Sequence, residues 1–94
     1  MSTSVNRTNS EPARAAEAVT LGSDWTPGAP LGSSARALWI GTGGDGTAVK
    51  VDMLEGGTAI TFNNVPSGSW LEVSVTKVYS TANGTTASDI VAVK

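Results

Sequence analysis

The segment Gly41-Thr-Gly-Gly-Asp-Gly46 has the spacing most suggestive of chemistry in this sequence. Its glycines at 41, 43 and 46 match the dinucleotide-binding fingerprint, in which a tight turn brings backbone N–H groups close to a pyrophosphate. That motif needs a helix after the glycines, whereas residues 47–54 alternate between apolar and polar types. A period of two predicts a strand, so we interpret the segment as a hairpin connection whose glycines supply positive φ.

Three carboxylates, Asp45, Asp52 and Glu55, lie close together in the sequence without forming a metal-binding pattern. Calcium takes about six to eight oxygen ligands at characteristic loop positions, and that spacing is missing here. The chain has no histidine and no cysteine, so the common zinc ligands and the usual base for a serine nucleophile are missing too. We therefore predict no catalytic residue, no metal and no cofactor, and we do not expect an enzyme.

The large apolar residues lie mostly between positions 36 and 93, in short alternating runs separated by Gly, Asn, Pro or Ser. Such alternation predicts successive antiparallel strands joined by short turns. Closing or covering the sheet would remove its exposed edges, so we expect an all-β fold, a small antiparallel β-sandwich or barrel of about six to seven short strands. The strands are expected at 16–21, 36–40, 47–54, 58–63, 70–79 and 89–93.

The alternation also predicts which side chains face the core. Val49, Val51 and Met53 share one face of their strand, and the next strand should turn Ile60 and Phe62 inward. Between these two strands, Glu55-Gly-Gly has the composition of a tight hairpin turn.

The chain divides into a polar N-terminal arm, residues 1–15, and a single β-domain, residues 16–94. The arm is too poor in apolar side chains to order by itself, so we expect it to be flexible or to become ordered against another subunit. The β-domain is also small, and a domain of this size buries only about 60% of its unfolded surface. With no cysteine for disulfides, association between copies is the ordinary remaining source of stability.

Charge and hydropathy argue against two classes of partner, nucleic acids and membranes. The net charge is −2, only 15% of residues are charged, and no basic stripe is present, so nucleic-acid binding is not expected. No apolar run approaches the length of a membrane span, and the first ten residues lack the apolar stretch of a secretory signal.

Five residues are candidate contacts to another subunit or partner: Trp25, Pro27, Arg36, Trp39 and Trp70. Trp25 is the one large residue of a loop rich in glycine and proline. It would either cover one end of the core or contact a neighbouring subunit, because tryptophan is favoured at the centres of interfaces. Trp39 and Trp70 lie inside strand patterns. We expect the three tryptophans to divide between core and subunit interface.

Several runs resemble one known family in their order and spacing. They are Pro12-Ala-Arg-Ala-Ala-Glu-Ala-Val-Thr, Arg36-Ala-Leu-Trp-Ile-Gly-Thr-Gly-Gly-Asp-Gly-Thr-Ala-Val, Gly57-Thr-Ala-Ile-Thr-Phe-Asn-Asn-Val-Pro-Ser-Gly, Val75-Thr-Lys-Val-Tyr-Ser-Thr and Thr85-Thr-Ala-Ser-Asp-Ile-Val-Ala-Val. Together they resemble the head spike base proteins of bacterial gene transfer agents and related tailed bacteriophages. The loop from Trp25 to Leu31 and the final lysine depart from that pattern.

The resemblance implies a virion structural protein on the capsid exterior, assembled in the host cytoplasm. It implies a homo-oligomer, with a pentamer favoured at a capsid vertex and a trimer possible. The partners would be the major capsid protein and a fibre or spike protein. The alternative is a small β-sandwich that binds glycans or decorates the capsid, since three tryptophans offer aromatic faces on which sugars stack.

Overall fold

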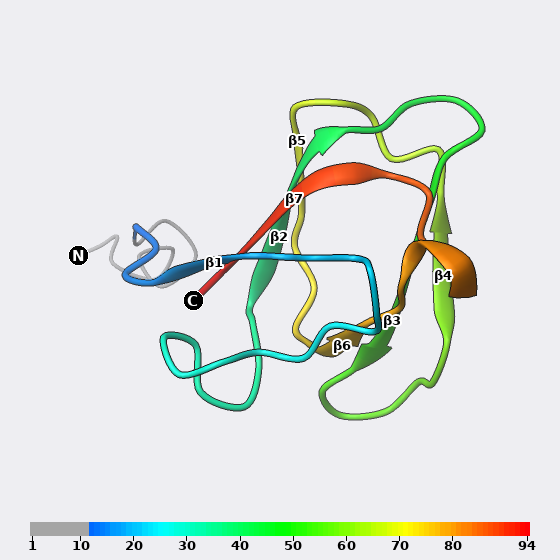
Figure 1. The fold of residues 1–94 in the computed structure, drawn as a ribbon. Coiled ribbons are helices and arrows are strands. Elements are labelled where there is room, and N and C mark those ends of the chain that lie inside the picture. Colours follow the sequence, from blue (N-terminus) through cyan, green and yellow to red (C-terminus); the bar gives the residue numbers. More distant parts are fainter. Residues whose placement is uncertain (1–11) are drawn as a thin grey trace.

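The computed structural model describes residues 12–94 and confirms an all-β fold (Figure 1). Every pairing between strands is antiparallel. The described residues also include one turn of 3-10 helix, η2 (Thr81–Asn83). The strands are β1 (Ala16–Ala18), β2 (Ala37–Thr42), β3 (Ala48–Met53), β4 (Ile60–Asn63), β5 (Ser69–Leu71), β6 (Val75–Val78) and β7 (Ser88–Val93).

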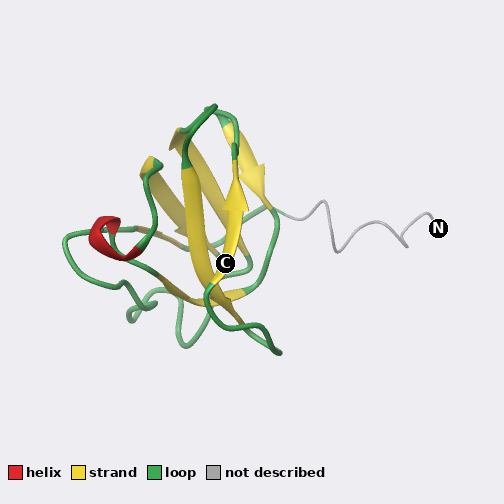
Figure 2. Ribbon diagram, turned by 90° about the vertical axis from the view of Figure 1, so that its right-hand side faces the viewer, coloured by secondary structure: helices red, strands yellow, loops and turns green. Residues whose placement is uncertain are grey.

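The strands form two sheets that lie against one another as the layers of a sandwich (Figures 1 and 2). Sheet A has the order β1-β7-β2-β5, and sheet B has the order β4-β3-β6. The core between them is built mainly from every second side chain of the strands, because successive residues of a strand point to opposite faces. Its fully buried members include Leu31, Leu38, Ile40, Val49, Val51, Val75, Val78 and Ile90.

The predicted faces of β3 and β4 are correct at four of five positions. Val49 and Val51 are fully buried, and Met53 and Phe62 pack against the core. The prediction for Ile60 is wrong, because 39% of its surface remains exposed. β4 is an edge strand of the smaller sheet, so alternation there does not guarantee that a side chain is covered.

The predicted strand over residues 70–79 is wrong in one respect, because the chain leaves sheet A and joins sheet B within it. β5 pairs with β2 in sheet A, whereas β6 pairs with β3 in sheet B. Residues 72–74 lie outside both strands and carry the chain across. The apolar alternation continues through this bend, since Leu71, Val73 and Val75 all contact the core, which is why the sequence reads as one strand.

The glycine-rich segment Gly41–Gly46 is not a hairpin connection, because it joins β2 of sheet A to β3 of sheet B. A strand follows it instead of the helix that a nucleotide-binding fingerprint requires. Two of its glycines have positive φ, 115° at Gly44 and 83° at Gly46, as expected. At Gly43 the requirement is space, since an added Cβ would overlap the carbonyl oxygen of Val65.

Backbone hydrogen bonds continue on the N-terminal side of Ala16. The N–H of Arg14 donates to the carbonyl oxygen of Lys94 at 2.7 Å, and the Lys94 N–H donates to Ala15 O at 2.9 Å. These bonds extend the pairing of β1 with β7 to Arg14 and Ala15, the last two residues of the predicted arm. The greater part of the predicted arm, residues 1–11, lies outside the described residues.

Candidate interaction surface

Trp25 lies in the core, where only 5% of its surface is exposed. Its backbone forms an isolated bridge with Val78, through Trp25 N–H to Val78 O at 2.8 Å and Val78 N–H to Trp25 O at 2.9 Å. Of the two roles expected for Trp25, the structure supports the first, in which Trp25 covers one end of the core. The following Pro27 is half-buried in the same loop.

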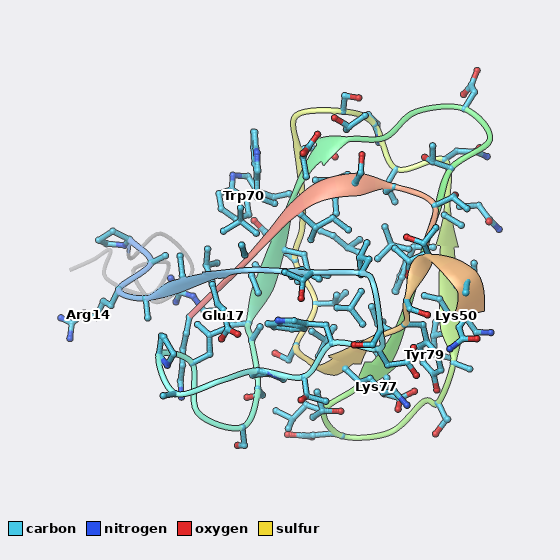
Figure 3. All side chains as sticks on the ribbon, viewed as in Figure 1. Arg14, Glu17, Lys50, Trp70, Lys77 and Tyr79 are labelled. Carbon is cyan, nitrogen blue, oxygen red and sulfur yellow. The ribbon has the colours of Figure 1, made fainter. Side chains whose placement is uncertain are left out.

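Trp39 and Trp70 face each other across sheet A, one from β2 and one from β5. Their ring centroids are 5.2 Å apart with planes at 63°, an edge-to-face arrangement that aromatic quadrupoles favour. Trp39 is partly buried, whereas Trp70 is 50% exposed and projects away from the sandwich (Figure 3). The sequence could not show this pair, because 30 intervening residues separate its two members.

The tryptophan pair belongs to a larger apolar surface, which we call the outer face of sheet A. The strand register sets its side chains in two rows that run across the sheet, and neither row contains a charged or polar side chain. The rows are Ala18–Val91–Trp39–Trp70 and Ala16–Val93–Ala37, of which Val93 is buried with 7% of its surface exposed. Arg36, the remaining candidate residue, is exposed directly before β2, and its N–H donates to Val93 O at 2.9 Å.

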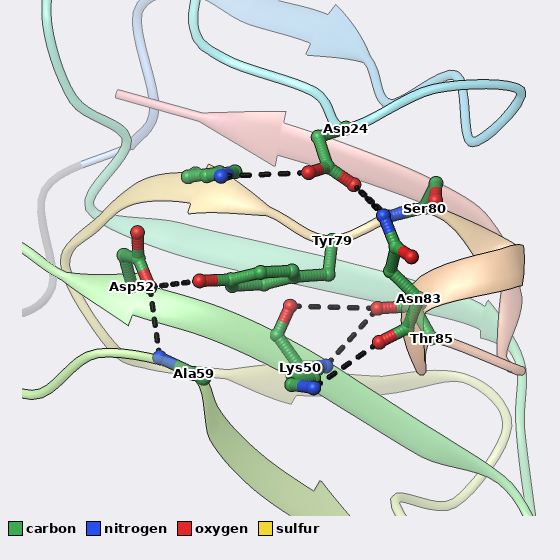
Figure 4. Close-up of polar contacts among 9 residues, drawn as sticks. Asp24, Lys50, Asp52, Ala59, Tyr79, Ser80, Asn83 and Thr85 are labelled. Carbon is green, nitrogen blue, oxygen red and sulfur yellow. Dashed lines mark hydrogen bonds and ion pairs between the residues drawn. The ribbon is translucent and has the colours of Figure 1, made fainter.

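The outward side of sheet B differs sharply, because it carries ionised groups around Tyr79 (Figure 4). The Tyr79 hydroxyl donates to Asp52 Oδ1 at 2.8 Å. The Nζ atoms of Lys77 and Lys50 lie 4.6 Å and 5.1 Å from the centre of the tyrosine ring, within the range of cation–π attraction. The sandwich is therefore amphipathic, with one apolar and one charged outer face.

Asp24 connects this cluster to the loop that precedes Trp25. Its carboxylate accepts from the Ser80 N–H at 2.8 Å and from Asn83 Nδ2 at 3.0 Å, and it lies 3.4 Å from Lys77 Nζ. The Asn83 side chain, followed by the Ser80 backbone N–H, lowers the pKa of Asp24 to about 2. The bonds hold the loop and η2 against sheet B.

The same cluster offers little for catalysis. The N–H of Ala59, at 2.8 Å, and then the Tyr79 hydroxyl lower the pKa of Asp52. The hydrogen bond to Asp52 raises the pKa of Tyr79 above its ordinary value, so the phenol keeps its proton at neutral pH and is a poor nucleophile. We interpret the cluster as a stabilising network.

A groove of about 390 Å³ opens where the chain crosses between the sheets. One wall is the start of the β3–β4 hairpin and the other is the 72–74 segment, and the Leu54 N–H donates to Ser74 O at 3.0 Å between them. Leu54 is 46% exposed. The sequence could not indicate this groove, because it exists only where the chain bends out of β5. We call it the Leu54 groove, lined by Met53, Leu54, Glu55, Gly56, Glu72, Val73 and Ser74.

Within residues 12–94, no three acidic side chains gather closely enough to hold a metal ion. No helix in this part of the chain is long and apolar enough to cross a membrane. Comparison of the chain with protein-family models, curated proteins and solved structures returns no match.

Proposed function

We propose that this protein is a structural component of a phage-like particle. It forms a homo-oligomeric base on the capsid exterior, at vertices, and carries a fibre or spike. The observation that carries the proposal is the outer face of sheet A, whose rows are apolar and include the half-exposed Trp70. The resemblance to head spike base proteins supplies the particle and the partners.

An apolar sheet face with an exposed tryptophan is the kind of surface that proteins cover in assemblies. Soluble monomers rarely expose large contiguous apolar patches, and those that they do expose are often functional. Tryptophans buried at the centre of an interface account for a large share of binding energy. The face has the composition of an assembly contact, while the charged outer face of sheet B suits exposure to solvent.

The capsid protein and the fibre protein are the proposed partners beyond the chain itself. Residues 1–11, rich in serine, threonine and asparagine, are proposed to contact the capsid or a neighbouring copy. The pentameric ring expected at a vertex stays a prediction, with a trimer as the other candidate.

Particle incorporation tests this proposal. The full chain and a chain lacking residues 1–11 are expressed in the producing host, and purified particles are examined by immunogold microscopy and mass spectrometry. The deletion leaves all described contacts in place, so circular dichroism should remain that of the full chain. We expect the full chain at capsid vertices and the deletion missing from them. Absence of the full chain from particles would refute the function, and normal incorporation of the deletion would refute the role of the arm.

A glycan-binding module is the second candidate, and the exposed ring of Trp70 favours it. Trp25 is buried, so Trp70 is the tryptophan to test. A glycan array should then show saturable binding that Trp70→Ala abolishes. Binding that survives this substitution, or no binding at all, would contradict the candidate.

A further inference from the structure

We propose that the Trp70 side chain of one copy inserts into the Leu54 groove of a second copy. The inference rests on the proposed homo-oligomer and identifies the two surfaces that meet in it. Among the described residues, the large hydrophobic side chains that remain exposed are Leu54, Ile60 and Trp70. Two of these three belong to the contact.

Trp70 has the properties of an interface anchor. The contact with Trp39 across β2 and β5 restricts the Trp70 side chain, so little side-chain entropy is lost when its exposed half is buried. Half of its surface is available to a partner, and it projects from the sheet instead of lying flat on it (Figure 3). Tryptophan is among the residues most enriched at binding hot spots.

The Leu54 groove is an open depression with apolar residues in its lining. Its volume of about 390 Å³ leaves room for an indole, and it is open to solvent. Met53, Leu54 and Val73 give it apolar walls, and the bond from Leu54 N–H to Ser74 O joins the two sides before any partner arrives. A preformed groove of this kind costs little to fill.

The polar atoms of the groove favour tryptophan over an aliphatic side chain. A buried indole needs an acceptor for its Nε1–H, because an unpaired buried donor is costly. Glu55, Glu72 and Ser74, whose side chains carry such acceptors, are among the residues that line the groove. A carboxylate acceptor makes the hydrogen bond charge-assisted and therefore stronger.

A second copy is the occupant that fits these observations best. Within one chain, Trp70 packs against Trp39 on the outer face of sheet A, which leaves the groove of that chain open. Residues 1–11 contain Met1 and Val5 as their apolar side chains and no aromatic residue, so the arm lacks a side chain to match the groove. Because the anchor and the groove are different surfaces, each copy carries one of each, as closed assemblies with head-to-tail contacts require.

The test is the native mass of the full chain by light scattering at several concentrations, with three variants. Trp70→Ser removes the anchor, Leu54→Asp places a charge in the groove, and Ile60→Ser is a matched control at an exposed residue that does not line the groove. Circular dichroism checks that each variant is folded. Leu54→Ser replaces Leu54→Asp if the latter does not fold.

We expect wild type and Ile60→Ser to assemble, and Trp70→Ser and Leu54→Asp each to raise the dissociation concentration at least tenfold. An equimolar mixture of the last two should contain a two-copy species, because Trp70→Ser keeps an intact groove and Leu54→Asp keeps an intact anchor. A monomeric wild type, normal assembly of either variant, or a mixture of monomers alone would overturn the inference. Particle incorporation is read separately, so wild type found in particles while Leu54→Asp assembles normally would refute the contact and leave the proposed function standing.

Discussion

Replacing Trp25 and Trp70 separately by alanine should affect stability very differently. Trp25 is 5% exposed within the core, and truncating a core tryptophan to alanine costs about 3–5 kcal/mol. Trp70 is 50% exposed and touches Trp39 edge-to-face, a contact of about 0.5–1.5 kcal/mol beyond its buried area. We therefore expect Trp25→Ala to lower the free energy of unfolding more than Trp70→Ala does.

The size of the domain makes the loss at Trp25 large in proportion. Native proteins have about 0.05–0.15 kcal/mol of stability per residue, which amounts to roughly 4–12 kcal/mol for the residues described here. Removing about 4 kcal/mol would leave a protein close to half unfolded at the lower limit. For a domain of this length, each kcal/mol shifts Tm by about 4–8 °C, so the Tm of Trp25→Ala should fall by about 15 °C or more.

The assay is urea unfolding followed by far-UV circular dichroism. The protein concentration is one at which light scattering gives the wild type and all variants the same mass. Trp25→Phe serves as the intermediate variant, since it keeps much of the buried volume. The slope of free energy against urea should be unchanged, because the surface exposed on unfolding is nearly the same. Equal losses for Trp25→Ala and Trp70→Ala, or a loss below about 1 kcal/mol at Trp25, would refute the assignment of Trp25 to the core.

Three further substitutions test the polar network and the inter-sheet connection. The pKa of Asp24 is about 2, below its ordinary value, so its contribution to stability is present above about pH 4 and is lost as the pH falls towards 2. Asp24→Asn should flatten the plot of unfolding free energy against pH in this window. Parallel plots for the wild type and the variant would contradict the network. Ultraviolet titration should give Tyr79 a pKa above its ordinary value of about 10, and Asp52→Asn should move that pKa down; an unchanged titration would exclude their hydrogen bond as its cause. Gly43→Ala should destabilise the protein by more than about 1 kcal/mol in urea unfolding, whereas Gly22→Ala, where the added Cβ meets open space, should stay within about 0.5 kcal/mol; equal effects would show that Gly43 is not constrained by space.

The sequence alone determined where most strands lie and which side of β3 faces inward. Alternation with a period of two is a local property, and Val49, Val51 and Met53 express it without reference to any other strand. The hairpin at Glu55-Gly-Gly was equally local, because Gly56 and Gly57 adopt the positive φ that such turns need. The missing histidine and cysteine likewise needed no structure to limit the chemistry of the chain.

The tertiary structure decided which sheet each strand joins. Residues 71–76 alternate without interruption, yet Leu71 pairs with Leu38 in sheet A and Val75 pairs with Met53 in sheet B. Both partners lie far away in the sequence, and pairing between distant segments depends on the packing of the whole sandwich. The Leu54 groove forms at that bend, so the sequence could not predict it either.

The tertiary structure also decided which of the three tryptophans are buried. Each is a single large side chain in a short apolar or loop segment, and composition gives all three the same expectation. Trp25 became a core residue because its loop bridges to Val78 of β6, and Trp70 became exposed because β5 turns it to the outer face of sheet A. Local sequence sets the alternation of a strand, but only the position of the opposing sheet decides which of its two faces is buried.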